Sequence, residues 1–329
     1  MRNRTAERQE LRRILLTGAS IQMFAPRRIG KTWLMHKLAE DLRKEDWLTI
    51  IVDVEGRRTE DDFVRALCAK IEQTGAYHQT AFNHLKQRVK QLLSGGWEGN
   101  PLQALGRLDF KQFSEELIST LNARPQQRTL ILIDEIALFV AELLAKDQEG
   151  ARTFLYHLRR LWQDYPRVQW LLTGSIGLDV AARRAGLAGA LVDLKIFALD
   201  PFDAAAARSY LDHLCATNAV PRPFTLDADA FAHFAHELGW LAPFYIQLVA
   251  DRIAPTGPVL NGRPPASIGD IDRAFEDLLH PVYRTKFSTF EEHIKKNFGA
   301  GEQRQLRTIL DACCGRAEGE TVATLLARL

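Results

Sequence analysis

The sequence lacks the features that mark a secreted or membrane-spanning protein. Its 4 cysteines show no C-x-x-C spacing, and the adjacent Cys313 and Cys314 are poor partners for a disulfide. No apolar leader opens the chain, and no uninterrupted apolar run is long enough to span a bilayer. These absences favour a reduced, cytoplasmic protein without membrane contact.

A large net charge is also missing. The 43 basic and 41 acidic residues leave a net charge of +2, so any contact with nucleic acid must be local. The densest basic segment is the N-terminus, with Arg2, Arg4, Arg8, Arg12 and Arg13. We interpret it as the solvated face of a first helix rather than as a nucleic-acid contact.

Short apolar runs rich in β-branched residues alternate with helical patterns along the first part of the chain. The expected strands are residues 21–25, 49–54, 129–133, 168–173 and 191–199. This alternation predicts an α/β fold, a parallel sheet covered on both faces by helices. After Pro201 the strand pattern stops and amphipathic helices follow. We therefore predict a three-layer core at residues 1–200, a helical lid at 201–285 and a helical C-terminal appendage at 286–329.

The first expected strand leads into A-P-R-R-I-G-K-T, which matches the phosphate-loop pattern G-x-x-x-x-G-K-[ST] except at Ala25. Gly30 lies where a side chain would collide with phosphates, Lys31 would reach the β- and γ-phosphates, and Thr32 would bind Mg²⁺. A methyl group at Ala25 is tolerated if φ stays negative there. The predicted nucleotide-binding residues are Ala25, Pro26, Arg27, Arg28, Ile29, Gly30, Lys31, Thr32 and Trp33.

Two later strands end in polar residues at the edge where parallel sheets bind ligands. After the apolar run T-L-I-L-I, Asp134 would hold Mg²⁺ and Glu135 would polarise the attacking water. The alternative for this pair is a helix N-cap followed by a first-turn acid. At the end of V-Q-W-L-L-T-G-S, Thr173 and Ser175 would orient that water or contact the γ-phosphate. Their alternative is an ordinary strand-to-turn junction.

The segments APRRIGKT, LILIDEI, WLLTGSIGLD and LGWLAPFYIQL, in this order, resemble the prokaryotic "archaeal ATPase" group. These are P-loop ATPases of the ASCE type (additional strand, catalytic glutamate), allied to AAA+ proteins and to the STAND signal-transduction ATPases. The resemblance covers roughly residues 10–285. It implies that Ala25 is acceptable and that the strand of Thr173 lies between the phosphate-loop and Asp134 strands. The group's lid motif Gly-x-Pro contacts nucleotide; the spacing is wider here, so only Pro243 is carried over.

In members of the group that this sequence resembles, a winged helix-turn-helix domain begins at the position of the C-terminal segment. We expect a helix to about Ala312, a turn at residues 315–319 and a helix with Thr321 as its N-cap. The apolar stripe of these helices is Leu306, Ile309, Leu310, Leu325, Leu326 and Leu329. The sequence stops before the recognition helix, so we expect no sequence-specific duplex binding by this chain alone and only weak, salt-dependent DNA affinity.

The sequence leaves the roles of several arginines and histidines open. The candidates for an arginine that completes hydrolysis, in cis or from a neighbouring subunit, are Arg27, Arg28, Arg159, Arg160, Arg183 and Arg184. The favoured alternative is a solvated helix face. His233 and His236 are one helical turn apart, but a helix surface or a lid contact is favoured over a metal pair.

Together these patterns predict an ATP-binding protein, a Mg²⁺-dependent ATPase that acts as a slow nucleotide-controlled switch or assembly. One alternative is a regulatory scaffold with negligible hydrolysis, which would not need Glu135. A P-loop kinase is a weaker alternative, because the sequence shows no recognisable pocket for a phosphate acceptor. The expected partners are ATP and ADP, with the lid and C-terminus as candidate surfaces for a second copy or a protein partner.

Overall fold

The computed structural model describes residues 4–73, 110–124, 127–174, 178–259, 262–314 and 320–328. The chain divides into two units, which are described separately. The first is Met1–Thr217 with Ala235–Gln247, and the second is Asn218–Phe234 with Leu248–Leu329. The predicted domain boundaries at residues 200 and 285 stay predictions.

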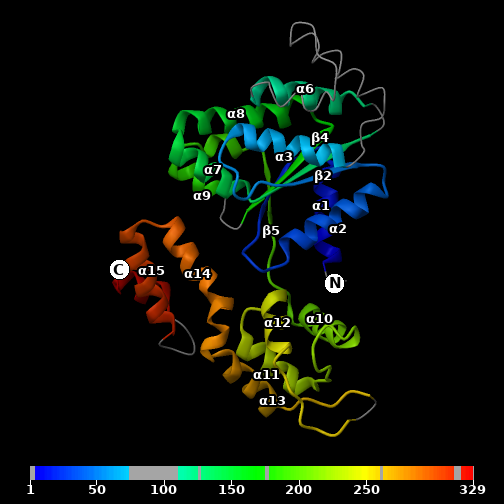
Figure 1. Cartoon of the computed structure of the whole chain (residues 1–329), viewed down its shortest axis with the longest axis vertical. Helices are drawn as coiled ribbons and strands as arrows, with labels where there is room; N and C mark the ends of the chain where they lie inside the picture. The colour runs from blue at the N-terminus through cyan, green and yellow to red at the C-terminus, as the bar shows by residue number, and fades with distance from the viewer. Residues whose placement is uncertain are drawn as a thin grey trace. The chain divides into compact units, whose positions relative to one another are not determined.

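The first unit contains a five-stranded parallel sheet (Figure 1). Its strands are β1 (Ile21–Phe24), β2 (Leu48–Asp53), β3 (Thr129–Asp134), β4 (Val168–Gly174) and β5 (Lys195–Ala198). The order β2-β3-β4-β1-β5 places β4 between β1 and β3. The predicted α/β fold and the position of the additional strand are confirmed.

The last expected strand begins later than predicted. Ala188–Leu191 forms a 3-10 helix, and β5 starts only at Lys195. Leu191 and Leu194 are both buried, and their spacing of three residues suits a helical turn rather than the two-residue period of a strand. The predicted strand therefore began four residues too early, and Val192 and Ile196 of the same run are exposed.

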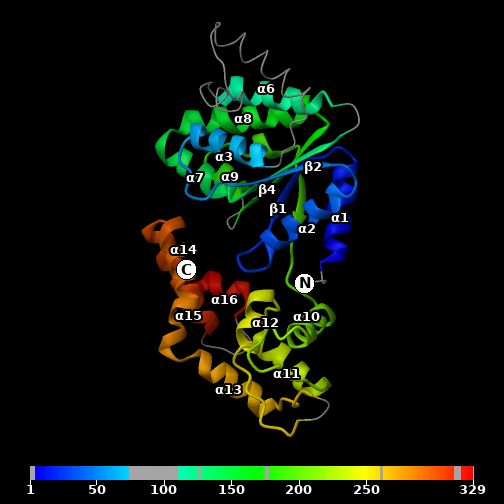
Figure 2. The same cartoon turned by 45° about the vertical axis from the view of Figure 1, so that its right-hand side comes forward.

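Helices cover both faces of this sheet (Figures 1 and 2). One face carries α1 (Thr5–Leu16) and α2 (Lys31–Arg43). The other carries α3 (Glu60–Gln73), α6 (Phe110–Asn122), α7 (Ile136–Lys146), α8 (Gln148–Asp164) and α9 (Leu178–Arg184). Successive residues of β3 alternate between the two cores: Leu130 and Leu132 pack with α1 and α2, and Ile131 and Ile133 with the other helices.

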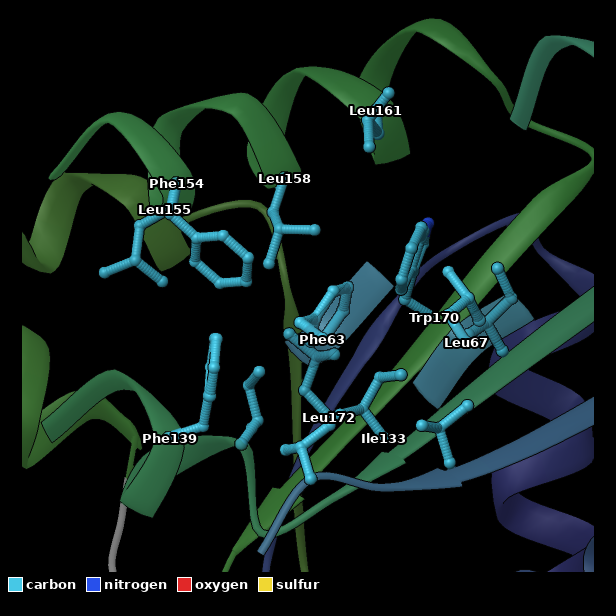
Figure 3. Packing of buried hydrophobic residues seen from close by; sticks show 14 of the residues in the cluster. Phe63, Leu67, Ile133, Phe139, Phe154, Leu155, Leu158, Leu161, Trp170 and Leu172 are labelled. Carbon is cyan, nitrogen blue, oxygen red and sulfur yellow. The ribbon is translucent and has the colours of Figure 1, made fainter. Parts of the chain in front are cut away.

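The core under α3 and α8 holds the strands of the site firmly in place (Figure 3). The rings of Phe63, Phe139 and Phe154 pack with centroids 5.3–5.5 Å apart. Trp170 and Leu172 of β4 are buried in the same cluster. Burying side chains of this size stabilises a fold by about 1.5–3 kcal/mol each. The carboxyl ends of β3 and β4 therefore follow directly from strands that are packed into this core.

The arginine-rich first helix forms as predicted, but its arginines are not simply solvated. Leu11 and Leu15 are fully buried against the sheet. Arg8 pairs with Asp41 of α2, and Arg12 Nε lies 2.6 Å from Glu45 Oε1 in the turn after α2. These arginines therefore connect α1 to α2 and to the turn that follows it.

Two helices lie largely or wholly in the first unit beyond the sheet, α10 (Ala204–Ala216) and α12 (Pro243–Ala250), which begins there. The second unit is helical, with most of α11 (Ala228–Leu238), α13 (Ile268–Leu278), the 3-10 turn Pro281–Tyr283, α14 (Arg284–Asn297), α15 (Ala300–Cys314) and α16 (Val322–Arg328). As predicted, Thr321 caps α16, since its hydroxyl accepts a hydrogen bond from Thr324 N at 3.2 Å.

Two observations concern the described residues as a whole. No helix among them is long and apolar enough to cross a membrane. They also hold no group of three or more His, Cys, Asp and Glu side chains suited to a metal. His233 pairs with Asp272 at 2.6 Å and His236 with Glu237 at 3.2 Å. The favoured interpretation of these histidines as surface contacts fits this geometry.

Candidate functional site

The predicted site lies at the carboxyl edge of the sheet, where β1, β3 and β4 end. β1 ends at Phe24, the loop follows, and α2 begins at Lys31. Backbone N–H groups in the first turn of a helix have no intrahelical acceptor, and the helix dipole makes that end positive. The start of α2 is therefore suited to an anion such as a phosphate.

The loop backbone explains which of its positions require glycine. Gly30 has a φ of +92°, which a residue with a side chain rarely adopts. Ala25 is buried and has a negative φ, because it is absent from the positive-φ residues of the described chain. The condition that makes alanine tolerable at position 25 is therefore met.

Lys31 and Thr32 meet the two acidic residues that end β3. Lys31 Nζ lies 2.8 Å from Asp134 Oδ1 and 2.6 Å from Glu135 Oε1. Thr32 Oγ1 donates a hydrogen bond to Asp134 Oδ2 at 3.0 Å. Lys31 and Asp134 are buried. The lysine charge is thus held between two carboxylates more than a hundred residues away in sequence.

The alternative role of Glu135 as a helix cap is not what its side chain does. Glu135 occupies the N-cap position of α7, but it makes no side-chain cap hydrogen bond. Its carboxylate is directed to Lys31 instead. Its φ of 56° is a left-handed conformation that costs a non-glycine residue about 1 kcal/mol or more. Strained residues of this kind cluster at functional sites.

Thr173 presents a buried hydroxyl with no partner. Its Oγ1 has no hydrogen bond in the part of the chain that the structure describes, and the residue is 2% exposed. Such a group costs about 1–3 kcal/mol when unsatisfied. Leu171 packs with α2, and side chains alternate along a strand, so Thr173 faces the same side as α2 and the phosphate loop. Ser175 lies outside the described residues.

The segment before and at the start of α12 closes the site within the first unit. A Cβ built on Gly30 would lie 3.8 Å from Cγ of Pro243. The guanidinium of Arg28 stacks 4.1 Å from the centre of the Phe244 ring. Burial raises the pKa of the Tyr245 phenol, and the charge of Arg28 and a hydrogen bond from it act in the opposite direction. Pro243 therefore lies beside the loop; its contact with nucleotide stays a prediction.

The remaining candidate arginines are engaged on the core surface. Arg159 Nε lies 2.6 Å from Asp193, Arg160 Nε 3.1 Å from Asp164, and Arg183 Nη2 2.6 Å from Asp179. Arg27 differs: its Nε is buried and makes no hydrogen bond within the described residues. The side chain of Arg184 lies outside them. This pattern favours paired helix faces for the helical arginines and singles out Arg27 in the loop.

A further carboxylate was missed by sequence reasoning. Asp53 ends β2 and pairs in register with Asp134 on the neighbouring strand. Both line a cavity of about 400 Å³ together with Thr32, His36 and Glu135. The signal was present in the sequence, because V-D-V-E-G places a carboxylate after an apolar run just as L-I-L-I-D-E does.

The oxygen donors at this edge suit a small divalent cation. Mg²⁺ prefers hard oxygen ligands and keeps several of its waters. The Thr32 hydroxyl and the Asp134 carboxylate are already adjacent, and the net charge of Lys31, Asp134 and Glu135 is −1 when all are ionised. The residues present therefore fit a hydrated Mg²⁺ ion held by Thr32 and Asp134.

Comparisons with known proteins concern the domain family and the fold. Residues 17–180 match a family model described as an AAA domain. A Walker-type ATPase of Pyrococcus abyssi shares the fold at a TM-score of 0.64 and 15% identity, over 96% of this chain and 80% of that chain. The Aeropyrum pernix ORC2 protein, in ADPNP-ADP complexes, matches at a TM-score of 0.56 and 17% identity, over 100% and 79% of the two chains. A comparison with curated proteins finds no match.

At these identities the solved structures establish the fold alone. The family match covers the phosphate loop, the Asp134-Glu135 strand and the strand of Thr173. The sheet order supplies the additional strand between β1 and β3. Residues 17–180 thus match an AAA domain, and the fold is one that a Walker-type ATPase shares, in keeping with the resemblance to P-loop ATPases.

Proposed function

We propose that this chain binds ATP with Mg²⁺ at the phosphate loop and hydrolyses it slowly. The observation that carries the proposal is the arrangement of Lys31 between Asp134 and Glu135, with Thr32 hydrogen-bonded to Asp134. An amine in this position is ready to transfer its hydrogen bonds to the β- and γ-phosphates. The Aeropyrum pernix ORC2 protein, whose structure is of ADPNP-ADP complexes, is in keeping with an adenine nucleotide as the ligand.

Each residue of the site has a role in this proposal. Gly30 and the first turn of α2 would bind phosphate oxygens through backbone N–H groups. Thr32 and Asp134 would hold Mg²⁺, which supplies charge neutralisation at the phosphates when bound. Glu135 would polarise the attacking water, and the Thr173 hydroxyl would orient it or donate to the γ-phosphate. Asp53, which is in register with Asp134 on the neighbouring strand, would not bind the Mg²⁺ ion directly.

A slow switch is the form of activity that the segment around Pro243 supports. Pro243 lies beside Gly30, and Phe244 holds Arg28 of the loop. A bound phosphate that moves the loop would therefore also displace the start of α12. Coupling of this kind lets nucleotide state be reported by a neighbouring element.

A regulatory scaffold without turnover is the second candidate, and one contact favours it. Glu135 is paired with Lys31 at 2.6 Å, so its carboxylate is engaged before any water is activated. Both candidates bind ATP; they differ in whether Glu135 is released to act as a base.

For DNA, we propose only weak, sequence-independent affinity of this chain alone. Arg8 and Arg12 of the basic N-terminal segment are ion-paired with Asp41 and Glu45. Their charge is therefore already neutralised within the first unit, which leaves little local field for phosphates.

The proposed function is tested by phosphate release measured across a range of Mg²⁺ concentrations. We expect the wild type to turn ATP over only with Mg²⁺. Thr32→Val, which keeps the shape but removes the hydroxyl, should need more Mg²⁺ for half-maximal activity. Thr308→Val, at an exposed site on α15, is the control and should behave as wild type. Activity that is equal in EDTA would contradict the Mg²⁺ assignment, and absence of turnover with ATP bound would favour the scaffold.

A further inference from the structure

Arg4 lies immediately before α1, yet its side chain is buried. The residue is 3% exposed, which is unusual for arginine. Burying a guanidinium costs free energy unless its charge and its N–H groups find partners. Three partners are in place, and each belongs to a different segment of the first unit.

The first contact neutralises the charge and the second reaches the phosphate loop. Arg4 Nη1 donates to Glu7 Oε1 at 2.6 Å, within α1. Arg4 Nη2 donates to the backbone carbonyl of Ile29 at 3.2 Å. Ile29 is itself fully buried and directly precedes Gly30.

The Ile29 carbonyl controls the direction of the next amide. In a trans peptide the C=O of one residue and the N–H of the next point in opposite directions. No cis peptide occurs in the described residues. Because Arg4 donates to the Ile29 oxygen, the Gly30 N–H points away from Arg4.

The third contact connects the loop to the segment beside Pro243. The Arg4 guanidinium stacks 4.4 Å from the centre of the Phe202 ring. The Phe202 N–H donates to the Leu241 carbonyl at 3.0 Å, two residues before Pro243. Arg4 therefore contacts the phosphate loop directly and is linked through Phe202 to the segment that precedes Pro243.

We propose that Arg4 is a positioning residue of the phosphate loop, which fixes the Ile29–Gly30 peptide so that the Gly30 N–H faces the bound phosphates. The inference rests on the proposed nucleotide binding at this loop. Only arginine can donate to a carbonyl, pair with a carboxylate and stack on a ring at once, because its guanidinium is planar and carries several donors. Lysine can keep the charge and one hydrogen bond but cannot stack in the same way.

The test compares Arg4→Met and Arg4→Lys with the control Arg13→Met. Arg13 lies on the same helix, is exposed and pairs only with Glu10 in the described contacts. Two quantities are measured on the full chain: the ATP dissociation constant by calorimetry, and the Gly30 amide resonance of protein labelled with ¹⁵N-glycine, without nucleotide. Thermal unfolding of each variant is recorded alongside.

We expect Arg4→Met to shift the Gly30 amide and to weaken ATP binding about 10- to 100-fold, the range for losing a hydrogen bond to a charged donor. Arg4→Lys should recover part of both, and Arg13→Met should change neither. A folded Arg4→Met protein with an unchanged Gly30 amide and wild-type affinity would overturn the inference. If Arg4→Met does not fold, Arg4→Lys decides by the same two measurements.

The two proposals can fail separately. If the wild type binds no ATP, the proposed function fails, and the Gly30 amide of the nucleotide-free variants still decides the role of Arg4. If the wild type binds ATP and the variants match it in affinity and in the Gly30 amide, only the role of Arg4 is lost.

Discussion

Replacing Glu135 by glutamine should separate nucleotide binding from hydrolysis. The amide keeps the size of the side chain and can still accept a hydrogen bond from Lys31, which retains Asp134 at 2.8 Å. The loop should therefore keep its conformation. An amide cannot take a proton from water, and a positioned general base contributes about 10²–10⁴ in rate, so turnover should fall by that factor.

The same substitution should not weaken ATP binding. Glu135 lies 2.6 Å from Lys31, so in the wild type it competes with the phosphates for the lysine. Removing its charge also removes repulsion between a carboxylate and the γ-phosphate. We expect affinity to be unchanged or to rise by up to about tenfold, or 1.4 kcal/mol.

The assays are calorimetric titration with ATP and continuous measurement of phosphate release. Glu149→Gln, at an exposed position in the first turn of α8, is the matched control and should retain wild-type values in both. Turnover by Glu135→Gln at the wild-type rate would refute the role of Glu135 as the base. A large loss of affinity would show that its charge maintains the loop, and the scaffold interpretation would gain.

Three further substitutions test other parts of the site. Ala25→Gly should leave the ATP affinity measured by calorimetry intact or slightly improved. It should lower the free energy of unfolding by about 0.5–1 kcal/mol, because glycine frees a backbone that alanine already holds at negative φ. A large loss of affinity would contradict this account. Thr173→Val should reduce phosphate release. The free energy of unfolding, measured by urea denaturation, should be unchanged or about 1 kcal/mol higher, since the hydroxyl it removes is buried without a partner in the described residues. Lower stability would mean that the hydroxyl is satisfied. Arg159→Ala should leave the turnover number unchanged because this side chain pairs with Asp193, and a fall of about 10³ or more would identify it as an arginine finger.

Much of the core could be predicted from local sequence patterns. Buried parallel strands are continuous apolar runs, so β1 to β4 were located to within a residue or two at each end. The phosphate loop and Asp134-Glu135 were placed correctly on a loop and a strand end because their positions follow from those strands. The place of β4 between β1 and β3 did not follow from the residues themselves and came from the family resemblance, and the places of β2 and β5 were not predicted.

The missed features depend on contacts between distant segments. Arg4 looks like one more arginine of a basic helix, and only the fold shows that it reaches Ile29 and Phe202. The same is true of Arg28, whose aromatic partner is more than two hundred residues away. Long polar side chains can reach many neighbours, so their sequence positions do not determine which partner they find.

The central claim is that Lys31 binds the phosphates of ATP, and calorimetry with Lys31→Ala tests it most directly. Lys37→Ala is the control, since Lys37 lies on the same helix and pairs with Glu40 near the surface. The account predicts saturable ATP binding by the wild type and by Lys37→Ala, and loss of most of that affinity in Lys31→Ala. Equal ATP affinity of Lys31→Ala and the wild type, in folded proteins, would contradict the assignment of the phosphate loop.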